Sequence, residues 1–177
     1  GVNEAFAPAW SPHGEWILFT GGSSLNPPWQ MYRMRMDGSP PSQLTGTILG
    51  THAGAWSQDD RIVYVRYNAI GLDPVFLEAV VMDTAGGELE VLPGRIPDFR
   101  GSYPAWSPNG QSILFMDVAA NDWVVTKLTL ASLQYDTLGS AAGNRPGEWS
   151  PDGQRIVYGT GDLWLMNADG SNKRVVL

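Results

Sequence analysis

The sequence contains no cysteine and only two histidines, His13 and His52, among its 177 residues. Without cysteine the chain has no disulfide, no thiolate–zinc site and no thiol nucleophile. Charged residues are few, at 16% of the chain, and 18 acidic against 11 basic residues give a net charge of −7. Because that charge repels a phosphate backbone, nucleic acid is not an expected partner.

Long hydrophobic runs are missing as well. No apolar stretch approaches the roughly 18–20 residues that a membrane-spanning helix needs, so we expect no membrane insertion. The hydrophobic content of 43% and the aromatic content of 11% suit one folded domain over residues 1–177.

One phrase occurs four times along the chain. The tryptophan at its centre is Trp10, Trp56, Trp106 or Trp149, at spacings of 46, 50 and 43 residues. It reads Ala-Trp-Ser-Pro-His-Gly, Ala-Trp-Ser-Gln-Asp-Asp, Ala-Trp-Ser-Pro-Asn-Gly and Glu-Trp-Ser-Pro-Asp-Gly in turn. This period is typical of the four-stranded blades of a β-propeller.

Each repeat predicts two hairpins. Ser-Pro-x-Gly places proline for a type I turn and leaves glycine free to adopt positive φ, so the tryptophan ends one strand and the next returns. The β-rich return strands are 16–19, 62–65, 113–116 and 156–158, the third strands are 31–34, 79–82, 124–130 and 163–166, and the outer strands end at 43–44, 90–92, 136–138 and 174–177.

The predicted fold class is therefore all-β, a β-propeller with four blades of four antiparallel strands each. The blades cover approximately residues 1–46, 47–94, 95–139 and 140–177. The step from Trp56 to Ile62 is one residue shorter than its counterparts, which predicts a tighter first turn at Asp59 and Asp60. No segment has a useful helical period.

Pro-Ala-Trp-Ser-Pro-Asn-Gly-Gln at 104–111 and Asp-Leu-Trp-Leu-Met-Asn-Ala-Asp-Gly-Ser at 162–171 resemble the WD-like repeats of the TolB propeller family. The resemblance covers nearly the whole chain and implies an extracytoplasmic (periplasmic or secreted) propeller that binds other macromolecules. Similar repeats form the gating propeller of prolyl oligopeptidases.

Four repeats are fewer than the six or more of TolB-like propellers. Three interpretations remain open: a self-closed four-bladed ring, a slice of a longer propeller, or two copies that join into an eight-bladed ring. An open row of blades leaves apolar faces uncovered, which folded proteins rarely tolerate.

Catalytic and metal-binding motifs are missing. Neither histidine has a partner at metal-ligand spacing, and the sequence has no Gly-x-Ser-x-Gly elbow, Gly-x-Gly-x-x-Gly loop or Walker-type loop. We therefore expect no enzyme, no metal and no cofactor. The four repeated tryptophans have a structural role in this interpretation, because packing between blades requires a large apolar group at one place in every blade.

Aromatic residues in the blade connectors and in the loops between second and third strands suggest a binding rim. The candidate rim residues are Trp29, Tyr67, Phe76, Phe99, Tyr103 and Trp123. Loop aromatics anchor protein interfaces and also stack on sugar rings, although they can equally fold back over the end of the propeller. The predicted function is a non-catalytic scaffold for a protein partner or for self-assembly, with carbohydrate or small-ligand binding and a detached peptidase propeller as alternatives.

Overall fold

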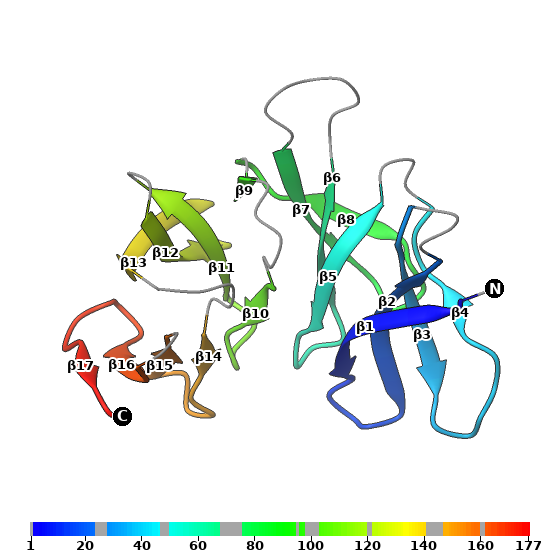
Figure 1. The fold of residues 1–177 in the computed structure, drawn as a ribbon, viewed down its shortest axis with the longest axis horizontal. Coiled ribbons are helices and arrows are strands. Elements are labelled where there is room, and N and C mark those ends of the chain that lie inside the picture. The colour runs from blue at the N-terminus through cyan, green and yellow to red at the C-terminus, as the bar shows by residue number, and fades with distance from the viewer. Residues whose placement is uncertain are drawn as a thin grey trace. The chain divides into compact units, whose positions relative to one another are not determined.

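The structure is a computed structural model that describes residues 2–23, 28–46, 50–67, 76–94, 96–97, 103–119, 122–140, 147–159 and 162–177. Every regular element within these ranges is a β-strand. The strands form four antiparallel sheets, each with four consecutive strands in sequence order (Figure 1). The chain is thus all-β and has four propeller blades of four antiparallel strands, as the repeat predicts.

Blades 1 and 2 occupy the first part of the chain. Blade 1 consists of β1 (Glu4–Trp10), β2 (Trp16–Gly22), β3 (Gln30–Arg35) and β4 (Ser42–Gln43). Blade 2 consists of β5 (Thr51–Trp56), β6 (Ile62–Tyr67), β7 (Phe76–Met82) and β8 (Glu88–Val91). A short fifth strand, β9 (Ile96–Pro97), also pairs with β7 and extends this sheet.

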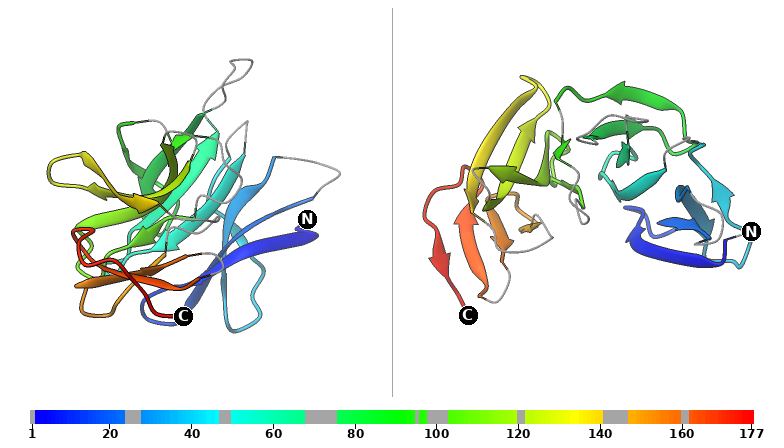
Figure 2. Two further views of the ribbon diagram at one scale, coloured as in Figure 1. Left: turned by 60° about the vertical axis from the view of Figure 1, so that its left-hand side comes forward. Right: turned by 45° about the horizontal axis from the view of Figure 1, so that its top comes forward.

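Blades 3 and 4 follow the same order. Blade 3 consists of β10 (Ala105–Trp106), β11 (Ser112–Ala119), β12 (Asp122–Thr129) and β13 (Gln134–Ser140). Blade 4 consists of β14 (Glu148–Trp149), β15 (Arg155–Tyr158), β16 (Trp164–Asn167) and β17 (Arg174–Val175). The strands of each sheet are twisted, as the two further views show (Figure 2).

The chain divides into two compact units, residues 1–98 and residues 99–177. Each unit holds two complete blades, so each has its own core between two sheets. The single domain expected from composition stays a prediction.

The serine after the motif tryptophan builds the first turn of each blade. In blade 4, the Ser150 hydroxyl donates to the Asp152 carboxylate at 2.5 Å and accepts from the Arg155 amide at 2.9 Å. Ser107 repeats both bonds with Asn109 and Ser112. The glycine that ends the turn has positive φ in blades 1, 3 and 4. The motif Trp-Ser-x-(Asn/Asp)-Gly thus encodes a turn closed by side chains.

The shorter turn expected in blade 2 is confirmed. The Ser57 amide donates to the carbonyl of Arg61, four residues on, whereas Ser11, Ser107 and Ser150 each bond a carbonyl five residues on. Asp60 adopts the positive φ of 61° that glycine adopts elsewhere. Because the turn of blade 2 is one residue shorter, an aspartate adopts the left-handed backbone conformation there. Aspartate tolerates this conformation better than most residues.

These turn carboxylates should make stability depend on pH. Hydrogen bonds from Ser150 and Gln154 lower the pKa of Asp152, and bonds from Ser39 and Ser171 do the same for the pKa values of Asp37 and Asp169. A carboxyl whose pKa is lower in the folded state stabilises the fold above its unfolded pKa, and this contribution is lost as pH falls through the folded pKa.

We therefore expect the melting temperature to fall between about pH 5 and pH 2, around and below the ordinary carboxyl pKa. The melting temperature of the Asp152→Asn variant should fall less over this interval. Glu90→Gln, which removes an exposed carboxyl on β8, is the control. Thermal unfolding followed by circular dichroism measures the melting temperature of each variant. Equal acid losses in Asp152→Asn and in the original chain would contradict the assignment.

Every blade has two distinct faces, which strand register defines. The tryptophan face carries the motif tryptophan and its cross-strand neighbours, which are Trp56, Ile62 and Met82 in blade 2 and Trp149, Ile156 and Met166 in blade 4. The reverse face carries the alternate residues, such as Leu18, Met31 and Leu44 in blade 1 and Leu114, Val125 and Leu138 in blade 3.

Within each unit, the tryptophan face of the later blade packs on the reverse face of the earlier one. One core cluster joins Leu18 and Met31 of blade 1 to Ile62 and Met82 of blade 2, with Trp56 at its margin. The second joins blades 3 and 4 in the same way, with Trp149 at its margin. Trp56 and Trp149 thus pack against the clusters between two blades, and a structural role for all four repeated tryptophans stays a prediction.

The expectation that all four motif tryptophans are buried is wrong for Trp10. Trp106 is 8% exposed, and Trp56 and Trp149 are half-buried against their clusters, whereas Trp10 is 59% exposed. All four occupy the same register position, so the local sequence does not cause the difference. Within the first unit, blade 2 packs on the reverse face of blade 1 and not on its tryptophan face, which carries Trp10.

Candidate functional site

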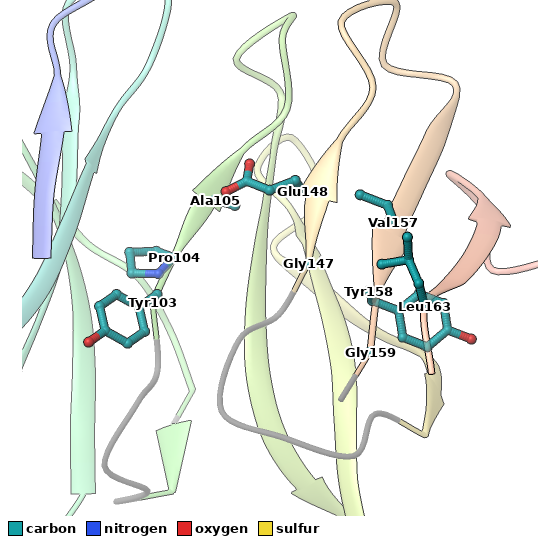
Figure 3. Close-up of a pocket in the computed structure, with 9 residues that line it drawn as sticks. All are labelled: Tyr103, Pro104, Ala105, Gly147, Glu148, Val157, Tyr158, Gly159 and Leu163. Carbon is teal, nitrogen blue, oxygen red and sulfur yellow. The ribbon is translucent and has the colours of Figure 1, made fainter. Parts of the chain in front are cut away.

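A pocket of about 210 Å³ opens in the second unit, at the inner strands of blades 3 and 4. Its lining residues are Tyr103, Pro104, Ala105, Gly147, Glu148, Val157, Tyr158, Gly159 and Leu163. In Figure 3, Tyr103 and Pro104 lie on the side of β10, Glu148 lies on β14, and Val157, Tyr158 and Leu163 lie on the side of β15. The pocket thus forms where the strand ends of two blades meet their loops.

Two glycines line the pocket at points of close backbone approach. Gly147 and Gly159 have φ values of 98° and 141°, which L-residues with a side chain rarely adopt. A Cβ atom at Gly147 would collide with the carbonyl oxygen of Val157, and one at Gly159 would collide with that of Asp162. The backbone therefore approaches itself closely on both sides of this pocket.

The pocket has both polar and apolar lining. Among the described residues that line it, Glu148 is exposed and is the one charged residue. Tyr158 is buried, and that burial raises the pKa of its phenol, so this group remains neutral at physiological pH. A lining of mixed polarity that includes a carboxylate suits a side chain with an apolar part and a hydrogen-bond donor.

The predicted rim residues separate into different environments. Tyr103 lines the pocket. In the first unit, Trp29 contacts Phe6 edge to face at 5.1 Å between ring centroids, and Phe6 and Tyr67 each lie 6.3 Å from the His52 ring. Trp29 and Tyr67 therefore belong to one aromatic cluster, with Phe6 and His52 between them.

Of the remaining rim residues, the structure describes the side chain of Trp123 alone. Trp123 packs on the core cluster of blades 3 and 4, so part of its ring stabilises the fold, as the alternative of loop aromatics folding back anticipates. The side chain of Phe76 and the whole of Phe99 lie outside the described residues. A binding role for the six predicted rim residues stays a prediction.

Sequence reasoning missed most of the pocket. Glu148 replaces the alanine that precedes the tryptophan in the other three repeats, and this departure is the one signal that marks it. Tyr158 lies on β15 and Leu163 directly precedes β16, and nothing in their local sequence distinguishes them. Their convergence depends on the packing of blade 4 on blade 3.

Charged groups elsewhere serve the fold. Arg66 on β6 bonds Glu78 at 3.1 Å and Glu88 at 2.6 Å, and Tyr64 donates to Glu88 at 3.0 Å. This network ties the three strands β6, β7 and β8 together. Across the described ranges, no three His, Asp or Glu side chains gather closely enough to hold a metal ion. The same ranges contain no helix with the length and hydropathy of a membrane span.

No protein-family model matches the chain. A curated relative, the Tol-Pal system protein TolB of Anaeromyxobacter dehalogenans strain 2CP-C, is 27% identical over 146 residues. That alignment covers 80% of this chain and 33% of the relative, so the chain spans about a third of the length of the curated proteins that it matches.

Solved structures show the same fold. A putative TolB from Agrobacterium tumefaciens superimposes with a TM-score of 0.76 at 20% identity, covering 98% of this chain and 62% of that one. TolB from Acinetobacter baumannii gives 0.74 at 19% identity, covering 98% and 42%. The acylaminoacyl peptidase of Pyrococcus horikoshii gives 0.66 at 17% identity, covering 98% and 32%. The fold therefore occurs both in TolB proteins and in a peptidase.

Proposed function

We propose that the chain, a TolB-like β-propeller, is a non-catalytic scaffold that binds another protein at the pocket of its second unit. The observation that carries the proposal is the pocket itself, where Tyr103, Glu148 and Leu163 present an aromatic, a carboxylate and an apolar group together. Leu163 is 43% exposed, so part of this surface is apolar and accessible. Pockets that combine aromatic anchors with a few polar groups favour side chains from a protein partner.

The relatives suggest which partner to test first. By name, the Anaeromyxobacter dehalogenans protein is a component of a Tol-Pal system. We propose that this chain binds a protein of such a system and acts outside the cytoplasm, as the TolB resemblance implies. The Pal component is the first candidate because the system is named for it.

Two alternative functions have weaker support. A gating propeller detached from a peptidase agrees with the fold of the Pyrococcus horikoshii enzyme, but a likeness at 17% identity carries the fold alone. Carbohydrate binding needs aromatic platforms with an open face. Trp29 packs against Phe6 and Trp123 packs on a core cluster, so neither supports that alternative.

Partner binding can be tested at Tyr103. Titration of purified Pal from Anaeromyxobacter dehalogenans into the 177-residue chain, followed by calorimetry, should give a dissociation constant in the micromolar range or tighter. Tyr103→Ala is expected to weaken binding about tenfold or more, because an aromatic anchor contributes at least about 1.4 kcal/mol. Tyr135→Ala, at a half-buried tyrosine of β13 that does not line the pocket, is the control and should bind normally.

Two results would contradict the proposed binding of a protein partner at the pocket. One is the absence of binding, and the other is equal loss of affinity in Tyr103→Ala and Tyr135→Ala. The non-catalytic part is tested with ester, peptide and glycoside substrates. Activity that co-purifies with the chain and disappears in His52→Ala would contradict it.

A further inference from the structure

Asn109 and Gly110 form the one Asn-Gly dipeptide of the sequence. In such a pair the backbone nitrogen of the glycine can attack the side-chain amide carbon of the asparagine, because glycine has no side chain to hinder a close approach of its backbone. The dipeptide lies in the first turn of blade 3, between β10 and β11, and Asn109 is exposed to water. Both reacting groups and water are thus present at this turn.

The folded turn engages both reacting groups in hydrogen bonds. The Gly110 amide donates to the carbonyl of Ser107 at 2.9 Å. The Oδ1 atom of Asn109 accepts from the Ser107 hydroxyl at 2.8 Å and from the Gln111 amide at 3.1 Å. Ring closure requires that the Asn109 side chain rotates and that the Gly110 nitrogen loses its proton. All three bonds must therefore open before the reaction can begin.

Blade 4 contains the same turn with an aspartate in place of the asparagine. The Oδ1 atom of Asp152 accepts from the Ser150 hydroxyl at 2.5 Å and from the Gln154 amide at 3.0 Å. Within the described ranges, the Nδ2 atom of Asn109 makes a single long bond, at 3.4 Å to Gln111. The turn therefore depends on the side-chain oxygen at this position and not on the nitrogen.

We propose that Asn109 is a site of spontaneous deamidation that the first turn of blade 3 controls. When the turn opens, the Gly110 nitrogen forms a bond to Cγ of Asn109, and the bond between Cγ and Nδ2 breaks. Nδ2 leaves as ammonia and carries away the proton of the Gly110 nitrogen. The product is a five-membered succinimide ring.

Water then opens this ring in one of two ways. If the bond between Cγ and the Gly110 nitrogen breaks, Cγ keeps the hydroxyl of the water, the nitrogen takes its proton, and residue 109 becomes an ordinary aspartate. If the bond between the backbone carbonyl carbon of residue 109 and that nitrogen breaks, the product is isoaspartate. The backbone of isoaspartate passes through Cβ and Cγ, so the turn is one atom longer.

The two products should affect the turn in opposite ways. Aspartate keeps an Oδ1 acceptor for Ser107 and Gln111, and its charge strengthens both bonds. Asp152 makes the equivalent bonds in blade 4. Isoaspartate has no side-chain oxygen at this place, because Cγ has become part of the backbone. We therefore expect the fold to tolerate aspartate and to lose stability with isoaspartate.

The control by the turn is tested with two matched serine variants. Ser107→Ala removes the hydroxyl that bonds Asn109 and the Ser112 amide, so the deamidation rate of Asn109 should rise about tenfold or more. Ser150→Ala removes the same pair of bonds in blade 4 and should leave that rate unchanged. Peptide mass spectrometry after incubation at mildly alkaline pH measures the rate, and circular dichroism establishes that each variant is folded.

The original chain provides a test that needs no variant. In urea at a concentration that unfolds the chain, Asn109 should deamidate at least about tenfold faster than in the folded chain under the same pH and temperature. This comparison decides the matter if Ser107→Ala does not fold. No deamidation of Asn109 in urea, equal rates in the folded and unfolded chain, or equal acceleration by Ser107→Ala and Ser150→Ala would each overturn the proposal.

Tolerance of the aspartyl product is tested separately. Asn109→Asp reproduces that product, and its melting temperature at neutral pH should equal or exceed that of the original chain. Asn109→Ala, which has no Oδ1 acceptor, is the control and should melt at a lower temperature. A lower melting temperature for Asn109→Asp, equal to that of Asn109→Ala, would show that the turn needs the amide and would overturn this part of the proposal.

Discussion

Replacing Trp106 with alanine is expected to lower the free energy of unfolding by about 3–5 kcal/mol, the usual cost of deleting a large buried aromatic side chain. Trp106 is 8% exposed and pairs with Ile113, which is fully buried. The substitution removes the largest apolar group of β10 and leaves a cavity beside this pair. Urea unfolding followed by fluorescence and circular dichroism measures the loss.

Trp10→Ala is the matched control for this substitution. It changes the same residue type at the same register position, but Trp10 is 59% exposed. The control should cost less than about 1 kcal/mol, as is usual for an exposed position. Equal losses in the two variants would contradict the assignment of Trp106 to the core.

Gly147→Ala is expected to cost at least about 3 kcal/mol, because it combines a disfavoured backbone conformation with a steric collision. Gly147 has a φ of 98°, and the added Cβ would meet the carbonyl oxygen of Val157 and the side chains of Tyr158 and Ile156. Either β14 or β15 must shift to make room. The same shift should abolish the binding of Pal at the pocket.

Gly38→Ala separates the two causes. Gly38 also has positive φ, at 83°, but a Cβ at this position has no heavy atom within 4 Å. Its substitution should therefore cost only the backbone strain of about 1–2 kcal/mol. Thermal and urea unfolding of both variants decide the matter, and a loss in Gly147→Ala no greater than in Gly38→Ala would exclude the collision.

The sequence determined the blades because their signals are local. The Ser-Pro-x-Gly turn, the missing residue before Ile62 and the β-rich return strands act within about fifteen residues, and the observed hairpins follow them. The sequence did not predict β9, because a strand of two residues has no hydrophobic pattern of its own. These residues form a strand only by pairing with β7.

Only the tertiary structure decided which of these equivalent residues are exposed. Trp10 and Trp106 occur in nearly the same phrase, yet the first is exposed and the second is buried, because burial depends on packing that the local sequence does not specify. The pocket likewise needs β10, β14 and β15 to meet, although Glu148 alone departs from the repeat. Neighbouring residues in the sequence determine the turns and strands, whereas packing between blades determines which side chains are exposed and which surfaces can bind.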